Sequence, residues 1–175
     1  MKGKLAYSVL LIGLIVFSTT MIISNLNLKE SERNLEVIMG NSLYHVWEPL
    51  NEVSESEGQE FSIDAFRLMN EKFESSLIYS DIVDKSVGSE VLTPVMLKLS
   101  QIGNEIENRY IQNGRFTKSD HVLYESYLEQ IHNTLGALYD VYYLSGSEGQ
   151  ANIKASNFNK LIEIDENLEQ IQLNS

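Results

Sequence analysis

The chain contains no cysteine, only two prolines, and no useful length of the hydrophobic–polar alternation that marks a strand. The lack of cysteine excludes disulfide bonds, thiolate metal sites and cysteine nucleophiles. The sequence also contains no Gly-rich phosphate-binding loop, no G-x-S-x-G element and no H-E-x-x-H motif. We therefore predict that the protein is not an enzyme and that it has no catalytic residue, cofactor or metal.

Basic residues are scarce as well. The chain has 13 Lys and Arg against 25 Asp and Glu, and its formal net charge at pH 7 is −12. A surface of this sign repels the phosphates of nucleic acids and the anionic headgroups of lipids. We therefore exclude nucleic acid as a partner.

The longest segment without a charged residue is Leu5–Leu28, a run of 24 residues directly after Met-Lys-Gly-Lys. About 20 helical residues suffice to cross the ~30 Å hydrocarbon core of a bilayer. We predict an uncleaved transmembrane signal anchor over residues 5–28. Two alternatives stay open: a cleaved secretory signal, which would make the protein secreted, and a buried helix of a soluble protein.

The basic residues around the run indicate its orientation. Lys2 and Lys4 precede the run, whereas Lys29 and Arg33 follow it among acidic residues. Cytoplasmic flanks carry the excess of Lys and Arg, so we expect the N-terminus in the cytoplasm. The prediction is a single-pass protein of the cell membrane, with a cytoplasmic tail (1–4), a helix in the lipid bilayer (5–28) and an extracytoplasmic domain (29–175).

After the run, hydrophobic residues recur at three- and four-residue steps, the spacing of one helix face. The first series is Leu35, Met39, Leu43, Val46, Leu50 and Val53. Between Leu28 and Trp47, Gly40 is the only residue that disfavours a helix, so we expect one helix to include both the uncharged run and the start of this series. Pro49 predicts a kink or an end of that helix near Trp47.

Four more helices are predicted from their boundary signals. The start signals are a capping residue, a capping residue before proline, and a capping box: Ser62, Thr93-Pro94, and Thr117 with Asp120. Asn113-Gly114 and Ser145-Gly146 end the third and fourth helices, and the last helix covers roughly 150–172. The predicted fold class is all-α: a single N-terminal transmembrane helix followed by an up-and-down bundle of four to five helices.

The fourth of these helices has the most regular hydrophobic face in the chain. Its members are His121, Tyr124, Leu128, Ile131, Leu135, Leu138 and Tyr142. A stripe this narrow is typical of a helix bundle or coiled coil, and it places Tyr127 on the flank. His121 lies in the first turn, where a partly exposed imidazole can respond to external pH.

Three aromatic residues are candidates for contact with a partner: Trp47, Tyr127 and Tyr143. The tyrosine ring buries readily while its hydroxyl stays hydrated, which enriches tyrosine at interfaces; packing in the core is the alternative. Glu129 and His132 match half of the Glu-x-x-His pattern of bundles that hold two metal ions. The second half is missing, so we predict no metal site.

These patterns favour a membrane-anchored, non-catalytic interaction module, meaning an adaptor or accessory subunit of a membrane-localised assembly with a protein partner. The alternative is a ligand- or pH-sensing bundle domain that signals through a partner protein. A pocket lined by several polar side chains would favour sensing. A solid core with exposed apolar surface would favour the interaction module.

Overall fold

The structure, a computed structural model, describes the backbone of residues 2–56, 62–147 and 149–174. Within these ranges, side chains are described for residues 18, 21 and 24–173. Contacts divide the chain into two compact units, Met1–Leu35 and Glu36–Ser175. The second unit contains the hydrophobic core.

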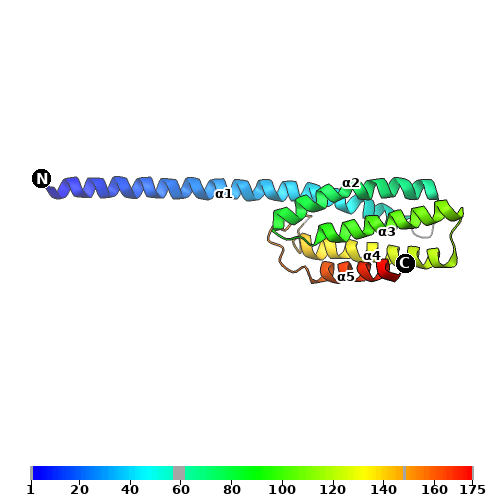
Figure 1. Ribbon diagram of the computed structural model, residues 1–175. Coiled ribbons are helices and arrows are strands. Elements are labelled where there is room, and N and C mark those ends of the chain that lie inside the picture. The colour runs from blue at the N-terminus through cyan, green and yellow to red at the C-terminus, as the bar shows by residue number, and fades with distance from the viewer. Residues whose placement is uncertain (1, 57–61, 148, 175) are drawn as a thin grey trace. The chain divides into compact units, whose positions relative to one another are not determined.

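The described chain is almost entirely helical (Figure 1). Its helices are α1 (Lys2–Glu55), α2 (Ile63–Val87), α3 (Leu92–Asn113), α4 (Lys118–Tyr142) and α5 (Asn159–Asn174). Over the described ranges the only β-type pairing is an isolated bridge between Tyr143 and Ala151. The predicted all-α class is confirmed.

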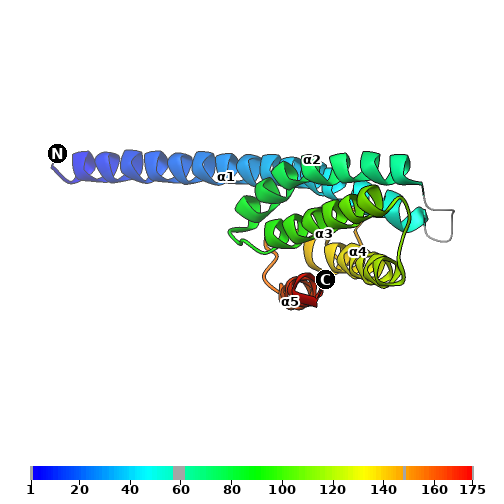
Figure 2. The same ribbon diagram turned by 45° about the vertical axis from the view of Figure 1, so that its right-hand side comes forward.

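Within the unit Glu36–Ser175, successive helices run antiparallel, as two views of the ribbon agree (Figures 1 and 2). α2 packs along α3, and α5 lies against both α3 and α4. The end of α1 meets α2 through a Glu52–Lys72 ion pair of 2.6 Å and meets α4 through a Ser54–His132 hydrogen bond of 2.8 Å. The predicted helical bundle is therefore confirmed.

The predicted membrane span mostly lies outside the described side chains, because those of residues 5–17, 19, 20, 22 and 23 are not described. Among the residues that are described, no helix offers a stretch both long and apolar enough to cross a bilayer.

Helix α1 continues past Pro49 to Glu55, so of the two predicted alternatives near Trp47, a kink or an end, the end is wrong. Proline removes one backbone donor from the helix interior. Burial outweighs that loss, because Leu50 and Val53 after the proline have no exposed surface and each fully buried aliphatic side chain contributes about 1.5–3 kcal/mol.

Three other predicted boundaries change. α4 ends at Tyr142 rather than at Ser145-Gly146. The N-cap of α3 is Val91, and its side chain makes no capping hydrogen bond, so Thr93 is not the cap. α5 begins at Asn159 rather than near residue 150. Residues 143–147 and 149–158 instead lie between the two helices, where Leu144 N–H donates to Gln150 O at 3.0 Å and Asn152 N–H donates to Tyr142 O at 2.7 Å.

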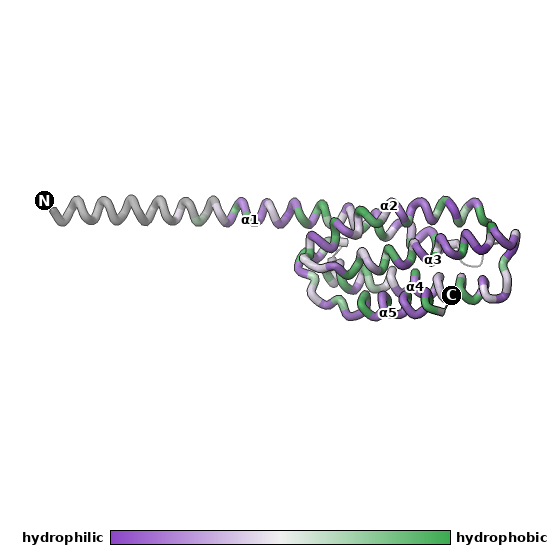
Figure 3. Tube along the Cα trace, viewed as in Figure 1, coloured by the Kyte–Doolittle hydropathy of each residue, from purple (hydrophilic) through white to green (hydrophobic). Residues whose placement is uncertain are grey.

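The core is built from the inward faces of all five helices, and Figure 3 shows hydrophobic and hydrophilic residues alternating turn by turn along the bundle. The buried face of α4 is wider than the predicted stripe. A second row is also buried: Leu123, Tyr127, Gln130, Thr134, Ala137 and Val141. Because α3, α5 and α1 all contact α4, a narrow hydrophobic stripe is not wide enough to cover its buried surface.

Candidate functional site

Tyr127 lies in the core, not on the flank of α4. Its side chain has no exposed surface, and its ring packs against Phe66 and Phe73, with centroids 6.2 and 6.3 Å away. Burial raises the pKa of its hydroxyl strongly. The Tyr127 ring therefore has no exposed surface, which corrects its predicted place on the flank of α4.

Trp47 and Tyr143 are both partly buried and packed against the core. The Tyr143 ring lies 5.4 Å from that of Tyr139, and burial raises the pKa of the Tyr143 hydroxyl. Their neighbours are more accessible: Tyr44, whose ring is 6.1 Å from Trp47, is 51 % exposed, and Tyr139 is 54 % exposed. Tyr44 and Tyr139 are therefore more exposed than the predicted residues Trp47 and Tyr143.

His121 lies exposed in the first turn of α4, with its ring edge-on to Phe116 at 5.3 Å. A role for His121 in pH sensing stays a prediction.

His132 joins α4 to α1. Its Nε2 lies 2.8 Å from the Ser54 hydroxyl, and its Nδ1 lies 3.0 Å from the Leu128 carbonyl. With Nδ1 donating to that carbonyl, Nε2 accepts from Ser54, an arrangement that also occurs in nucleophile–base pairs. Both residues lie inside helices, whose backbone N–H groups bond to their own turns and so provide no oxyanion site beside Ser54. We assign this pair to packing between helices.

Glu129 is exposed beside His132 on α4. In the part of the chain that the structure describes, no group of three His, Asp or Glu residues is arranged to hold a metal ion.

A groove of about 690 Å³ lies between α3, α4 and α5 on the described surface. Val122, Leu123 and Ile171 form its apolar floor, and Arg109, Lys118 and Ser126 contribute polar groups. None of the residues that line it is acidic. In a chain with 25 acidic and 13 basic residues, a hollow of this composition is unexpected. We call it the α3–α4 groove.

Two smaller hollows, of about 340 and 310 Å³, adjoin His132 and Asn133 on α4. Both include acidic residues, such as Glu129 in one and Asp140 in the other. All three hollows open to solvent, so they are surface features and do not extend through the core.

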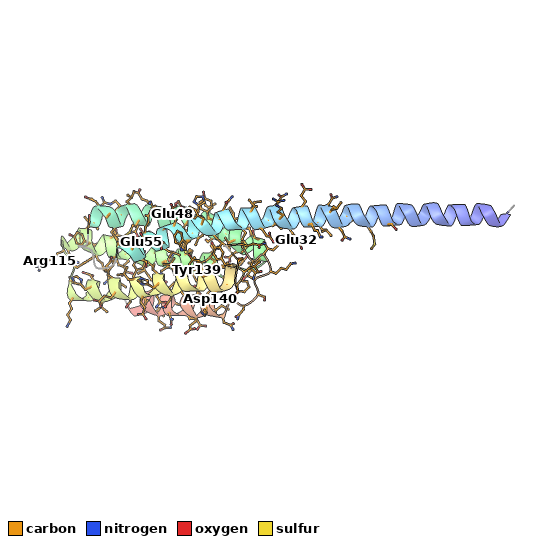
Figure 4. The ribbon with its side chains drawn as sticks, turned by 180° about the vertical axis from the view of Figure 1, so that it is seen from behind. Glu32, Glu48, Glu55, Arg115, Tyr139 and Asp140 are labelled. Carbon is orange, nitrogen blue, oxygen red and sulfur yellow. The ribbon has the colours of Figure 1, made fainter. Side chains whose placement is uncertain are left out.

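The sequence patterns did not single out the residues of the α3–α4 groove. Val122 lies off the hydrophobic stripe and is 57 % exposed. One signal was present: residues 108–119 contain Arg109, Arg115 and Lys118 without a single acid. Figure 4 shows Arg115 at the end of the bundle where α3 turns into α4, away from Tyr139 and Asp140.

Comparison with family models, with curated proteins and with solved structures finds no match for this chain.

Proposed function

We propose that this protein is a membrane-anchored, non-catalytic interaction module. Residues 5–28 span the cell membrane with the N-terminus in the cytoplasm, and the helical bundle binds a protein partner on the other side. The observation that carries this proposal is the uncharged run Leu5–Leu28 behind Lys2 and Lys4, which has the length and flanking charge of a signal anchor.

The build of the bundle supports an interaction role over a sensing one. Its core is filled by large apolar side chains, including Leu43, Leu50, Phe66, Met96 and Ile106. The hollows described lie on its surface, and apolar side chains such as Val37, Tyr44 and Val122 are more than half exposed. A solid core with apolar groups outside is the arrangement expected of a protein that binds another protein.

The anchor is tested by replacing Leu11 and Leu14 with lysine. Each lysine near the centre of a span costs about 2.5–3.5 kcal/mol of insertion free energy. We expect the wild-type chain to stay in the membrane pellet after an alkaline carbonate wash and the double variant to become extractable. A variant with valine at both positions is the control. Extraction of the wild-type chain by carbonate would contradict the anchor.

Orientation and partner are tested on intact cells. Protease added outside should degrade residues 36–175, and full protection would place the bundle in the cytoplasm instead. Crosslinking before solubilisation, with the wild-type chain and the double lysine variant compared, should recover a specific protein with the wild-type chain only. Recovery of the wild-type chain alone, with a co-purifying small molecule, would favour the sensing alternative.

A further inference from the structure

Four aromatic residues lie where α1 and α4 run antiparallel (Figures 1 and 2): Tyr44, Trp47, Tyr139 and Tyr143. The Ser54–His132 hydrogen bond sets the register of the two helices. Trp47 lies seven residues before Ser54 and Tyr139 lies seven residues after His132, so each shares a helix face with its partner in that bond. Both are two turns, ~10 Å, along the bundle from it. We call the four residues the aromatic patch.

The segment after α4 joins the end of the aromatic patch to α1. Tyr143 forms the isolated bridge with Ala151. A Cβ atom on Gly40 of α1 would lie 3.9 Å from the Cβ of Ala151, so Ala151 lies between Tyr143 and α1. Tyr44 follows Gly40 by one turn of the same helix. Contacts from outside the two helices therefore also bring the tyrosine of α1 and the tyrosines of α4 to one surface.

The rings of the aromatic patch are close together and accessible. The centroids of the Tyr44 and Trp47 rings are 6.1 Å apart, and those of Tyr139 and Tyr143 are 5.4 Å apart. Tyr44 and Tyr139 are each more than half exposed, while Trp47 and Tyr143 pack partly against the core. The face of a tyrosine or tryptophan ring attracts a cation within ~6 Å of its centroid. Two rings at these separations can therefore contact one cationic side chain.

The two helices that carry the aromatic patch lack basic residues along their paired segments. Residues 35–55 of α1 and 119–142 of α4 contain no Lys or Arg. Their acidic residues are Glu36, Glu48, Glu52, Glu55, Asp120, Glu125, Glu129 and Asp140. The basic residues of the bundle lie mainly on α2 and α3: Arg67, Lys72, Lys85, Lys98 and Arg109. The negative charge is thus unbalanced along α1 and α4 in particular, and not only in the chain as a whole.

Two carboxylates lie directly beside the rings. Glu48 accepts a hydrogen bond of 3.2 Å from the Tyr44 hydroxyl, and its negative charge raises the pKa of that hydroxyl. Asp140 follows Tyr139 in the sequence and pairs with Lys160 of α5. Figure 4 shows Glu48 on α1 and both Tyr139 and Asp140 on α4. Each helix therefore places a carboxylate next to an exposed ring.

We propose that the aromatic patch binds an arginine-containing basic segment of a protein partner. This inference rests on the proposed interaction function and names its surface and the chemistry of the partner. The arginine guanidinium is planar, stacks on aromatic faces and bonds to carboxylates, so it matches the rings and Glu48 together. An acidic segment would be repelled by the carboxylates of α1 and α4. A proline-rich segment would contact the rings but would leave those charges unbalanced.

The test uses the full chain in neutral lipid nanodiscs and a short fluorescent peptide of alternating glycine and arginine. We expect saturable binding by fluorescence anisotropy, with empty nanodiscs as the blank. A peptide with lysine in place of arginine has the same charge but stacks less well on rings, so it should bind about threefold more weakly. An uncharged peptide of alternating glycine and proline should bind more weakly than either.

Substitutions locate the arginine peptide on the chain. Tyr44→Ala and Tyr139→Ala should each weaken its binding about two- to fivefold, and the double variant about tenfold. Ile111→Ala on α3, where the side chain is 54 % exposed, is the matched control and should leave binding unchanged. Glu48→Gln should weaken binding about threefold, whereas Glu71→Gln at an exposed position of α2 should not. Circular dichroism checks that every variant keeps its helices.

Four results would overturn the proposal: no saturable binding, equal affinity for the arginine and lysine peptides, tighter binding of the proline peptide, or unchanged binding by the double tyrosine variant. Equal affinity would mean that net charge alone attracts the peptide. None of these results affects membrane extraction or crosslinking, so the aromatic patch can fail while the anchored interaction module stands.

Discussion

Gly103 allows two buried polar side chains to approach the backbone of α3. A Cβ atom at this position would lie 2.5 Å from Asn70 Oδ1 and 3.2 Å from the Tyr127 hydroxyl. Asn70 is held in place by its amide, which donates to Glu107 at 3.1 Å. Glycine, whose side chain is a single hydrogen atom, is therefore required at position 103, where α2, α3 and α4 meet.

We predict that Gly103→Ala destabilises the bundle by about 1–3 kcal/mol, because buried neighbours must shift to admit the methyl group. Gly136→Ala on α4 is the control, since a Cβ there meets nothing within 4 Å. That substitution should stabilise the helix by up to about 1 kcal/mol. Urea unfolding measures both changes. Stabilisation by both variants would contradict the close approach at Gly103.

Asp120 is a buried carboxylate that completes the capping box of α4. Its pKa is lowered first by the Thr117 hydroxyl, which donates to Oδ2 at 2.7 Å, and further by the Thr117 N–H and by Arg109. Burial opposes this shift by raising the pKa, but the hydrogen bonds prevail. The folded state therefore favours the ionised form.

The sign of the pH dependence follows from this lowered pKa. Asp120 contributes its full stability above the pKa of an unfolded aspartate, about 3.9, and loses it as the pH falls through the lower pKa of the folded state. Asp120→Asn should cost about 1–2 kcal/mol at pH 7. The difference in unfolding free energy between Asp120→Asn and the wild type should narrow below pH ~4. Urea titrations at several pH values measure it, with exposed Asp64→Asn as the control; a gap independent of pH would contradict the assignment.

At the scale of helices, the two buried caps differ in how they arise. The cap of α4 is local, since Thr117 and Asp120 bond to each other within one turn. The cap of α3 comes from the preceding helix: the Asp84 carboxylate of α2 accepts from Leu92 N–H at 3.0 Å and from Thr93 N–H at 2.8 Å. Asp84 is only 2 % exposed.

We predict that Asp84→Ala destabilises the bundle by about 2–4 kcal/mol, because two N–H groups at the start of α3 lose a charged acceptor. Thr93→Val should change stability by less than about 1 kcal/mol, since the buried Thr93 hydroxyl has no hydrogen-bond partner within the described ranges. Thermal unfolding of both variants tests the assignment. A larger loss from Thr93→Val than from Asp84→Ala would restore Thr93 as the cap.

Local signals explain which helix boundaries were predictable. The Ser62 side chain accepts a hydrogen bond from Ala65 N–H at the start of α2, and Gly114 ends α3 with φ at +67°. Both boundaries were predicted from residues within a few positions along the chain. Polar residues on the inward face were not predictable as core. The Ser76 and Ser80 hydroxyls are buried on α2 because each donates to a carbonyl of its own helix, at 2.7 and 2.8 Å.

At the scale of the molecule, the bundle depends on contacts between distant parts of the sequence. The stacked rings of His45 and Tyr79, 4.3 Å apart, join α1 to α2, and Lys98 joins α3 to α5. Between α4 and α5, the Gln150 side chain donates a hydrogen bond of 3.2 Å to Glu36 of α1. Hydrophobic periodicity shows which face of each helix is buried, but it does not show which helices pack against one another. None of these contacts was therefore predictable.

The sequence by itself determined the helical class, the caps of α2 and α4, and most residues of the core, because these depend on neighbours within one or two turns. It also supplies the whole basis for the proposed anchor. Only the packed bundle shows that Tyr127 is buried and that Asp84 caps α3. The physical reason is that burial of a side chain depends on which helices surround it, and only the packed bundle specifies those neighbours.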